Sequence, residues 1–198
     1  MELTYNHRVP VQLRFNDADA LGHINNSVYF SFYDLGKTEY FKAVRGRYIE
    51  TKDIDIVVVH AEVDFLSPVF LSDTIEVQTA VSAIGNKSFT LVQRIMDTAT
   101  DTVKCICTTI MVGFDQKTQQ SKPISDEWKE AISAFEGRRF LNISTDGDPA
   151  WIYHLERAAR LAVGAFYRSS VRSPVCRRFV CGRSGGDCPD GRVCRSGT

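Results

Sequence analysis

The sequence predicts an α+β fold in which an antiparallel sheet of about five strands wraps around one long helix. Two observations predict it. A helical segment from about Asn26 to Val44 carries more apolar surface than one stripe can hold, and several β-rich segments joined by short links follow it. The chain has 198 residues, of which 43% are hydrophobic and 24% charged, which fits one globular domain with an appendage.

The first predicted strand spans Val9 to Phe15. Apolar residues alternate with polar ones along this segment, which is the period of a half-buried strand. Pro10 has no backbone N–H to donate to a neighbouring strand, so we expect it at a sheet edge or at the start of the strand.

The long predicted helix begins with a natural cap. Asn25 or Asn26 can accept hydrogen bonds from the free N–H groups of the first turn. The polar residues of the helix form a narrow strip (Ser27, Ser31, Asp34, Thr38, Lys42 and Arg45), and most of the remaining surface is apolar. We therefore expect the helix to be covered on most sides.

Four β-rich segments follow at residues 54–66, 74–84, 87–96 and 102–114. Gly85-Asn86 suits a tight connection, and the short links predict antiparallel neighbours. Ser125 is a predicted cap for a short closing helix over residues 125–135, with acidic residues in its first turn.

The composition changes sharply near Gly137. Residues 1–137 carry 13 basic and 19 acidic side chains, a net charge of −6, whereas residues 138–198 carry 11 basic and 5 acidic, a net charge of +6. We predict a domain over residues 1–137 and an Arg/Cys-rich tail over 138–198, with a short helix at 149–167. The cysteine spacing of the tail is not that of a standard zinc site.

The segment from Asn16 to Phe30 combines two carboxylates with a helix start and a group of aromatic residues. A helix N-terminus exposes unpaired N–H groups that can stabilise the negative charge on an attacked carbonyl. A nearby aspartate can attack that carbonyl or activate a water molecule. This pattern suits acyl transfer, although an Asp-x-Asp pair before a helix is more often a turn and cap.

The run Phe15-x-Asp17-x-Asp19-x-x-Gly22-His23-x-Asn25-Asn26-x-x-Tyr29 resembles the signature of hotdog-fold acyl-CoA thioesterases, in the branch similar to 4-hydroxybenzoyl-CoA thioesterase. The resemblance extends over roughly residues 5–135. It implies a hotdog fold, in which an antiparallel sheet wraps a central helix.

The resemblance also implies roles for individual residues. Asp19 would be the catalytic carboxylate, as nucleophile or general base, and Asp17 would be structural. The backbone N–H of Asn26 would form the oxyanion hole, and Gly22 would allow a close approach of the backbone. The residues that would position the loop or bind substrate are His23, Asn25, Tyr29, Lys87 and Ser88. Of these, Lys87 matches a position that meets the phosphates of coenzyme A in relatives.

The implied reaction is hydrolysis of an acyl-CoA thioester to a free acid and CoA, in a homodimer or tetramer with no metal or organic cofactor. Two alternatives stay open: a thioesterase that meets its substrate on acyl-carrier protein, and a non-catalytic acyl-thioester binding protein. The N-terminus lacks the apolar core of a signal peptide, so we expect a cytoplasmic protein that binds neither membrane nor nucleic acid.

Overall fold

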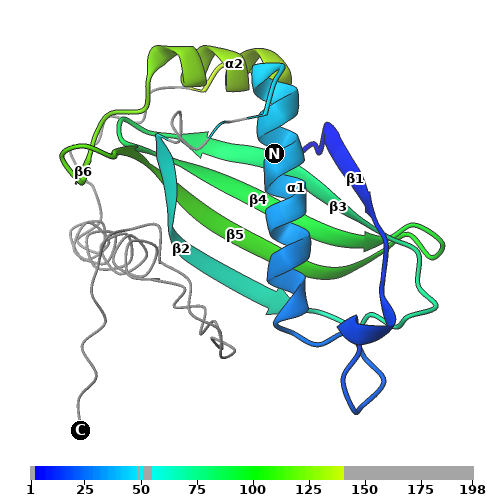
Figure 1. Cartoon of the computed structure of the whole chain (residues 1–198). Coiled ribbons are helices and arrows are strands. Elements are labelled where there is room, and N and C mark those ends of the chain that lie inside the picture. The colour runs from blue at the N-terminus through cyan, green and yellow to red at the C-terminus, as the bar shows by residue number, and fades with distance from the viewer. Residues whose placement is uncertain (1–2, 49, 51–54, 141–198) are drawn as a thin grey trace, which may run out of the picture.

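The computed structural model describes residues 3–48, 50 and 55–140 (Figure 1). The predicted tail helix at 149–167 lies outside these residues. The elements in chain order are β1 (His7–Val11), the 3₁₀ turn η1 (Phe15–Asp17), α1 (Val28–Arg45), β2 (Ile56–Phe65), β3 (Ile75–Ile84), β4 (Ser88–Asp97), β5 (Thr102–Asp115), β6 (Gln120–Ser121) and α2 (Asp126–Glu136). This is the predicted α+β architecture.

All strand pairs are antiparallel, as predicted, and the sheet order is β1-β3-β4-β5-β2, with β6 on β5. Only β3, β4 and β5 form a simple meander. The chain crosses the sheet between β2 and β3, which leaves β2 at one edge and β1 at the other. The pairing of neighbours inferred from short links is therefore wrong for β2.

The first strand is earlier and shorter than predicted. It covers His7–Val11 instead of Val9 to Phe15, because the chain leaves the sheet after Val11 and turns at Phe15–Asp17. Pro10 lies inside β1, paired with Glu76 at the edge of the sheet. This agrees with the edge position expected for a residue without an N–H.

The helix α1 lies across one face of the sheet (Figure 1). It approaches β3 and β4 closely at Gly36, where an added Cβ would come within 2.5 Å of Val77 Cγ1 and 3.0 Å of Gln93 Nε2. Gln93 is fully buried and donates from Nε2 to the backbone oxygen of Tyr33 at 2.9 Å. A residue without a side chain at this point therefore sets the distance between helix and sheet.

The helix α1 is buried along one face only. Its buried residues are Tyr29, Phe32, Tyr33, Gly36, Tyr40 and Phe41. Two apolar residues of the opposite side, Phe30 and Leu35, are 47% and 41% exposed. The expectation that the helix is covered on most sides is thus wrong for the single chain, in which the sheet covers one face and the opposite side keeps exposed apolar residues.

The helix α2 closes one end of α1. Ser125 caps α2 by accepting from the Trp128 backbone N–H, as predicted. The carboxylate of Glu136, at the other end of α2, is buried and accepts from Tyr40 Oη at 2.6 Å and from the Val81 N–H at 2.9 Å. These contacts join α2 to both α1 and the sheet.

Candidate active site

The loop between η1 and α1 is held mainly by its own hydrogen bonds. The Asp17 carboxylate accepts from the Arg14 N–H at 2.7 Å, and its backbone oxygen accepts from the Asn25 N–H at 2.8 Å. The Ile24 N–H donates to the Val69 backbone oxygen at 2.8 Å, which ties the loop to the segment between β2 and β3. The loop is therefore a defined structure at the N-terminal end of α1.

Asp19 is half-buried at the start of a tight turn within this loop. Its backbone N–H donates to the His23 oxygen at 2.8 Å, and its Oδ1 accepts from the Leu21 N–H at 2.8 Å. Its Oδ2 has no hydrogen-bond donor within the described part of the chain. The Oδ1 hydrogen bond thus holds the side chain within the turn.

The helix α1 begins one to two residues later than predicted, with Ser27 as its N-cap residue. Asn25 still organises this start, because its Oδ1 accepts from both the Ser27 N–H at 2.9 Å and the Ser27 hydroxyl at 2.7 Å. The backbone N–H of the exposed Asn26 has no acceptor among the described residues. An unpaired donor thus lies at the positive end of the helix dipole.

Gly22 and His23 are two further predicted site residues in this loop. Gly22 has a φ of +79°, a backbone conformation that L side chains rarely adopt, but no described atom lies within 4 Å of an added Cβ. Its backbone conformation therefore accounts for the glycine, and within the described part of the chain no other segment approaches it closely. His23 is half-buried with its ring edge-on to Phe70 at 5.3 Å, so it packs against the loop after β2.

Tyr29 lies in the core and not on an open surface. Its side chain is 2% exposed, its hydroxyl accepts from the Val69 N–H at 3.3 Å, and its ring meets Phe65 edge-on at 5.1 Å. Burial raises the pKa of the Tyr29 hydroxyl. In the single chain, Tyr29 packs the start of α1 against the end of β2 and the segment that follows it.

Lys87 and Ser88 lie at the other end of the sheet from Asp19. The backbone oxygen of Lys87 accepts from the Gly113 N–H, and Gly113 is paired with the first residue of β2. The Nζ of Lys87 lies 3.4 Å from Ser121 Oγ. The Asp19 loop packs beyond the last residue of β2. The ten residues of β2 separate the two groups by about 30 Å. The chain does not bring these predicted site residues together.

A cavity of about 320 Å³ lies between α1 and β2, above β4 and β5. Its lining residues are Phe30, Tyr33, Asp34, Lys37, Val58, Ala61, Gln93, Cys107 and Thr109. Phe30 belongs to the aromatic group noted beside the predicted helix start, but the sequence did not assign the polar lining residues of α1 and the sheet to a common cavity. Their only signal in the sequence was an alternating strand pattern that places Cys107 and Thr109 on the face toward the helix.

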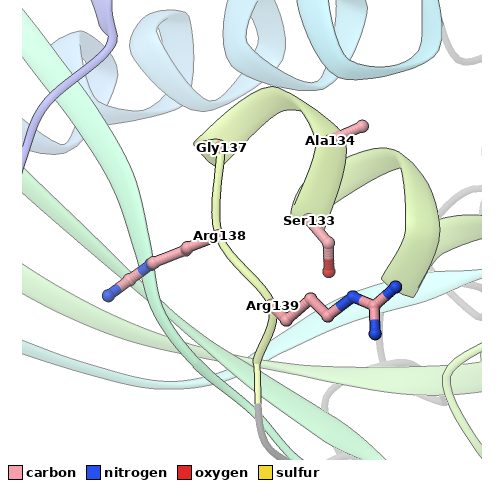
Figure 2. Close-up of a pocket in the computed structure, with 5 residues that line it drawn as sticks. All are labelled: Ser133, Ala134, Gly137, Arg138 and Arg139. Carbon is pink, nitrogen blue, oxygen red and sulfur yellow. The ribbon is translucent and has the colours of Figure 1, made fainter.

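A second hollow, of about 370 Å³, lies at the C-terminal end of α2 (Figure 2). It is lined by Ser133, Ala134, Gly137, Arg138 and Arg139, and the two arginine side chains point in different directions. Arg138 donates to the backbone oxygen of Val81 and therefore anchors this end of the domain to β3. Neither arginine lies near the Asp19 loop.

Among residues 3–48, 50 and 55–140, no group of three or more His, Cys, Asp or Glu side chains is arranged to hold a metal ion. Nor is any helix in this part of the chain both long and apolar enough to cross a membrane.

The chain belongs to the Thioesterase-like superfamily, whose family model matches residues 13–132. This match includes the Asp19 loop, the long helix and the whole meander. The hotdog fold and the thioesterase resemblance predicted from the Asp-x-Asp signature are confirmed.

Individual relatives are similar over part of their length. The chain is 31% identical over 81 residues to YsmA of Bacillus subtilis (strain 168) and spans about half of that protein, 54% of its length and 41% of this chain. It is 27% identical over 92 residues to the acyl-CoA thioester hydrolase YbgC of Escherichia coli O6:H1, covering 46% of this chain and 69% of YbgC.

A solved structure has the same fold over its entire length. A thioesterase from Thermus thermophilus, in complex with coenzyme A and zinc, superimposes with a TM-score of 0.61 and 28% sequence identity. The match covers 71% of this chain and 100% of that structure.

Proposed function

We propose that this protein hydrolyses an acyl-CoA thioester to a free carboxylic acid and CoA. The observation that supports the proposal is that one loop carries both an Asp19 carboxylate oxygen and, just before α1, an Asn26 N–H that have no hydrogen-bond partner among the described residues. The similarity to a hydrolase of acyl-CoA thioesters and to a thioesterase that binds coenzyme A supports this substrate class.

The two groups have complementary roles in this reaction. The Asn26 N–H donates to the thioester oxygen, on which negative charge develops as the carbonyl is attacked. Asp19 either takes a proton from the attacking water or attacks the carbonyl itself, in which case water then hydrolyses the resulting anhydride. In both routes the C–S bond breaks, a C–O bond forms, and the thiolate of CoA takes up the proton that water supplies.

Replacing Asp19 by asparagine tests this role. Asp19→Asn retains the Oδ1 acceptor for the Leu21 N–H, so the loop should keep its shape while the base is lost. We expect kcat to fall by at least about a hundredfold with an unchanged melting temperature, measured by release of thiol from acyl-CoA. Asp101→Asn, in the exposed turn between β4 and β5, is the matched control and should retain activity. Unchanged turnover by Asp19→Asn would remove this residue from the mechanism.

We further infer that the working enzyme is a homodimer that pairs at β2. This strand is a sheet edge, and apolar residues next to it or to the Asp19 loop are exposed: Phe15, Leu21, Phe30, Val58 and Phe65. A two-fold axis at β2 runs the paired strands in opposite directions. The Lys87 end of one protomer then comes beside the Asp19 loop of its partner, where Lys87 and Ser88 can meet the phosphates of CoA.

Mixing two impaired variants tests the shared site. Asp19→Asn removes the carboxylate, and Lys87→Glu should raise the KM for acyl-CoA by charge repulsion. If each site takes Asp19 from one protomer and Lys87 from the other, a mixed dimer has one intact site. We expect refolded mixtures to regain turnover at low substrate concentration that neither parent shows. Absence of this recovery, with mixed dimers shown by mass spectrometry, would contradict a site built from two chains.

One feature of the chain bears on whether coenzyme A or acyl-carrier protein carries the acyl group. Gly85 and Asn86, directly before Lys87, supply no positive charge for the nucleotide part of CoA. Acyl-carrier protein would supply the acyl group on an arm without that nucleotide. Turnover of the same acyl group on the two carriers decides between them, and zero turnover on both, over a range of acyl chains, would favour a non-catalytic binding protein.

A further inference from the structure

Lys104 of β5 binds the segment 66–74, the crossing segment that carries the chain from β2 to β3. Its Nζ donates to the Pro68 backbone oxygen at 3.3 Å and pairs with the Asp73 carboxylate at 3.1 Å. Its backbone oxygen accepts from the first two N–H groups of the segment at 2.9 and 3.0 Å. One residue of the sheet therefore holds the crossing segment near both of its ends.

The ammonium group of Lys104 is largely enclosed. Its side chain is 13% exposed, compared with 42% for Lys42 and 40% for Lys122. A further carboxylate oxygen, from the buried Asp97 at the end of β4, lies 3.6 Å from the Lys104 Nζ. A buried ion pair adds little net stability over an apolar contact, so stability alone does not explain an enclosed lysine at this place.

The crossing segment also holds the Asp19 loop. The Val69 backbone oxygen accepts from the Ile24 N–H at 2.8 Å, and Phe70 forms an antiparallel bridge with His23. Val69 and Ile24 are both fully buried, and the rings of Phe70 and His23 meet edge-on at 5.3 Å. The two residues that directly follow the oxygen bound by the lysine are thus the two that contact the loop.

Asp19 lies one step further along the same set of contacts. Its backbone N–H donates to the His23 oxygen at 2.8 Å, and its neighbour Ala18 forms an antiparallel bridge with Ile24. The position of the Asp19 backbone therefore depends on residues 23–24, and their position depends on the crossing segment. Two successive layers of backbone contacts connect the carboxylate to the residue that anchors this segment.

We propose that Lys104 is a positioning residue for thioester hydrolysis, which sets the place of the Asp19 carboxylate by anchoring the crossing segment to the sheet. A displacement of about 1 Å in a catalytic group can lower turnover by about a hundredfold, so an anchor of the loop affects the rate without touching the thioester. This inference rests on the proposed function, because it takes Asp19 as the carboxylate that acts on the substrate.

Lys104→Met tests the inference, because it removes the charge and keeps a side chain of similar length. The substrate is the acyl-CoA that the unaltered protein hydrolyses fastest in a panel from acetyl-CoA to palmitoyl-CoA that includes phenylacetyl-CoA. At a temperature at which circular dichroism shows each variant to be folded, kcat should fall by at least about tenfold while KM changes by less than about twofold.

Arg45→Met is the matched control. Arg45 is 17% exposed and pairs with Glu127 at 2.8 Å, so it is a cation about as enclosed as the lysine. It lies in the last turn of α1, at the opposite end of the helix from the Asp19 loop. This variant should leave kcat unchanged whatever its effect on the melting temperature.

Hydrogen exchange at single amides gives a second readout that does not depend on activity. The Ile24 N–H is the bond that joins the loop to the crossing segment. In Lys104→Met its exchange should accelerate by at least about tenfold more than that of amides in the middle of β4, because the opening is local. A role in overall stability alone would accelerate both to the same extent.

The outcomes separate this inference from the proposed function. An unchanged kcat in Lys104→Met, or equal acceleration of exchange at Ile24 and in β4, would overturn the inference while leaving the hydrolase intact. No hydrolysis of any thioester of the panel by the unaltered protein would contradict the proposed function, and the inference with it. If Lys104→Met does not fold, Lys104→Gln retains a polar group there and should change both measurements in the same directions.

Discussion

At the scale of single residues, the amides and carboxylates before α1 could be located from the sequence because their preferences are local. Asn25 organises the helix start within two residues of the predicted cap, since a short amide oxygen reaches N–H groups close by in the chain. The family resemblance places Tyr29 near substrate, yet in the single chain it lies in the core. Its surroundings come from Val69 and Phe65, about 40 residues away, which no local pattern indicates.

The buried carboxylate of Glu136 gives a prediction at this scale. It accepts from Tyr40 Oη and the Val81 N–H, and hydrogen bonds to charged groups contribute about 1.5–3 kcal/mol. Both bonds end on Oε1, which Glu136→Gln keeps as a neutral amide oxygen. Because two hydrogen bonds to a charged group become two weaker neutral ones, the free energy of unfolding should fall by about 2 kcal/mol, measured by urea denaturation.

Glu127→Gln is the matched control for this measurement. Glu127 lies on the same helix and pairs with Arg45 at 2.8 Å, but its side chain is 72% exposed. We expect a change below about 1 kcal/mol, because exposed ion pairs contribute little. Equal losses from the two variants would show that burial of Glu136 has no special effect.

At the scale of elements, the sequence predicts which segments are strands and which are helices, because the spacing of apolar residues is a local property. It does not predict which strands pair with each other in the sheet. The four strands from β2 to β5 lie within a few residues of their predicted ranges. The sequence pattern of β2 does not distinguish pairing with β3 from pairing with β5, since both would bury one face. Its place at the edge depends on the segment 66–74, which carries the chain across the sheet.

Gly36 gives a prediction for the contact between α1 and the sheet. Alanine normally favours a helix over glycine by about 1 kcal/mol. Here the added methyl group would lie 2.5 Å from Val77 Cγ1, so Gly36→Ala should instead lower the free energy of unfolding by about 1–3 kcal/mol. Ser31→Ala, on the exposed side of α1, is the control and should be neutral or slightly stabilising. A stabilised Gly36→Ala would mean that the helix can move away from the sheet without loss.

At the scale of the whole molecule, we propose that the folded domain extends a few residues beyond the predicted boundary at Gly137. Arg138 bonds to the backbone of β3, and Phe140 packs against the core cluster that contains Trp128 and Tyr40. The change in composition located the domain boundary only approximately, because the contacts of Arg138 and Phe140 depend on where α2 ends. They favour a boundary after Phe140.

Two truncations test this boundary. A chain ending at Phe140 should keep the melting temperature and thioester hydrolysis of the full chain. A chain ending at Gly137 loses the Arg138 hydrogen bond and the Phe140 packing, and its melting temperature should fall by several degrees. Loss of folding in the chain that ends at Phe140 would show that residues 141–198 belong to the domain.

Pro10 has a consequence for how far assembly can proceed. A sheet in which both edge strands can pair with another chain could add copies at both sides and form a filament, which natural sheets avoid. Here the margin opposite β2 is the five-residue β1, interrupted by a residue with no hydrogen to offer. Pairing at β2 would occupy the one long edge strand of the described sheet that can accept another strand. Assembly through the sheet would therefore stop at a closed dimer and not continue into a filament.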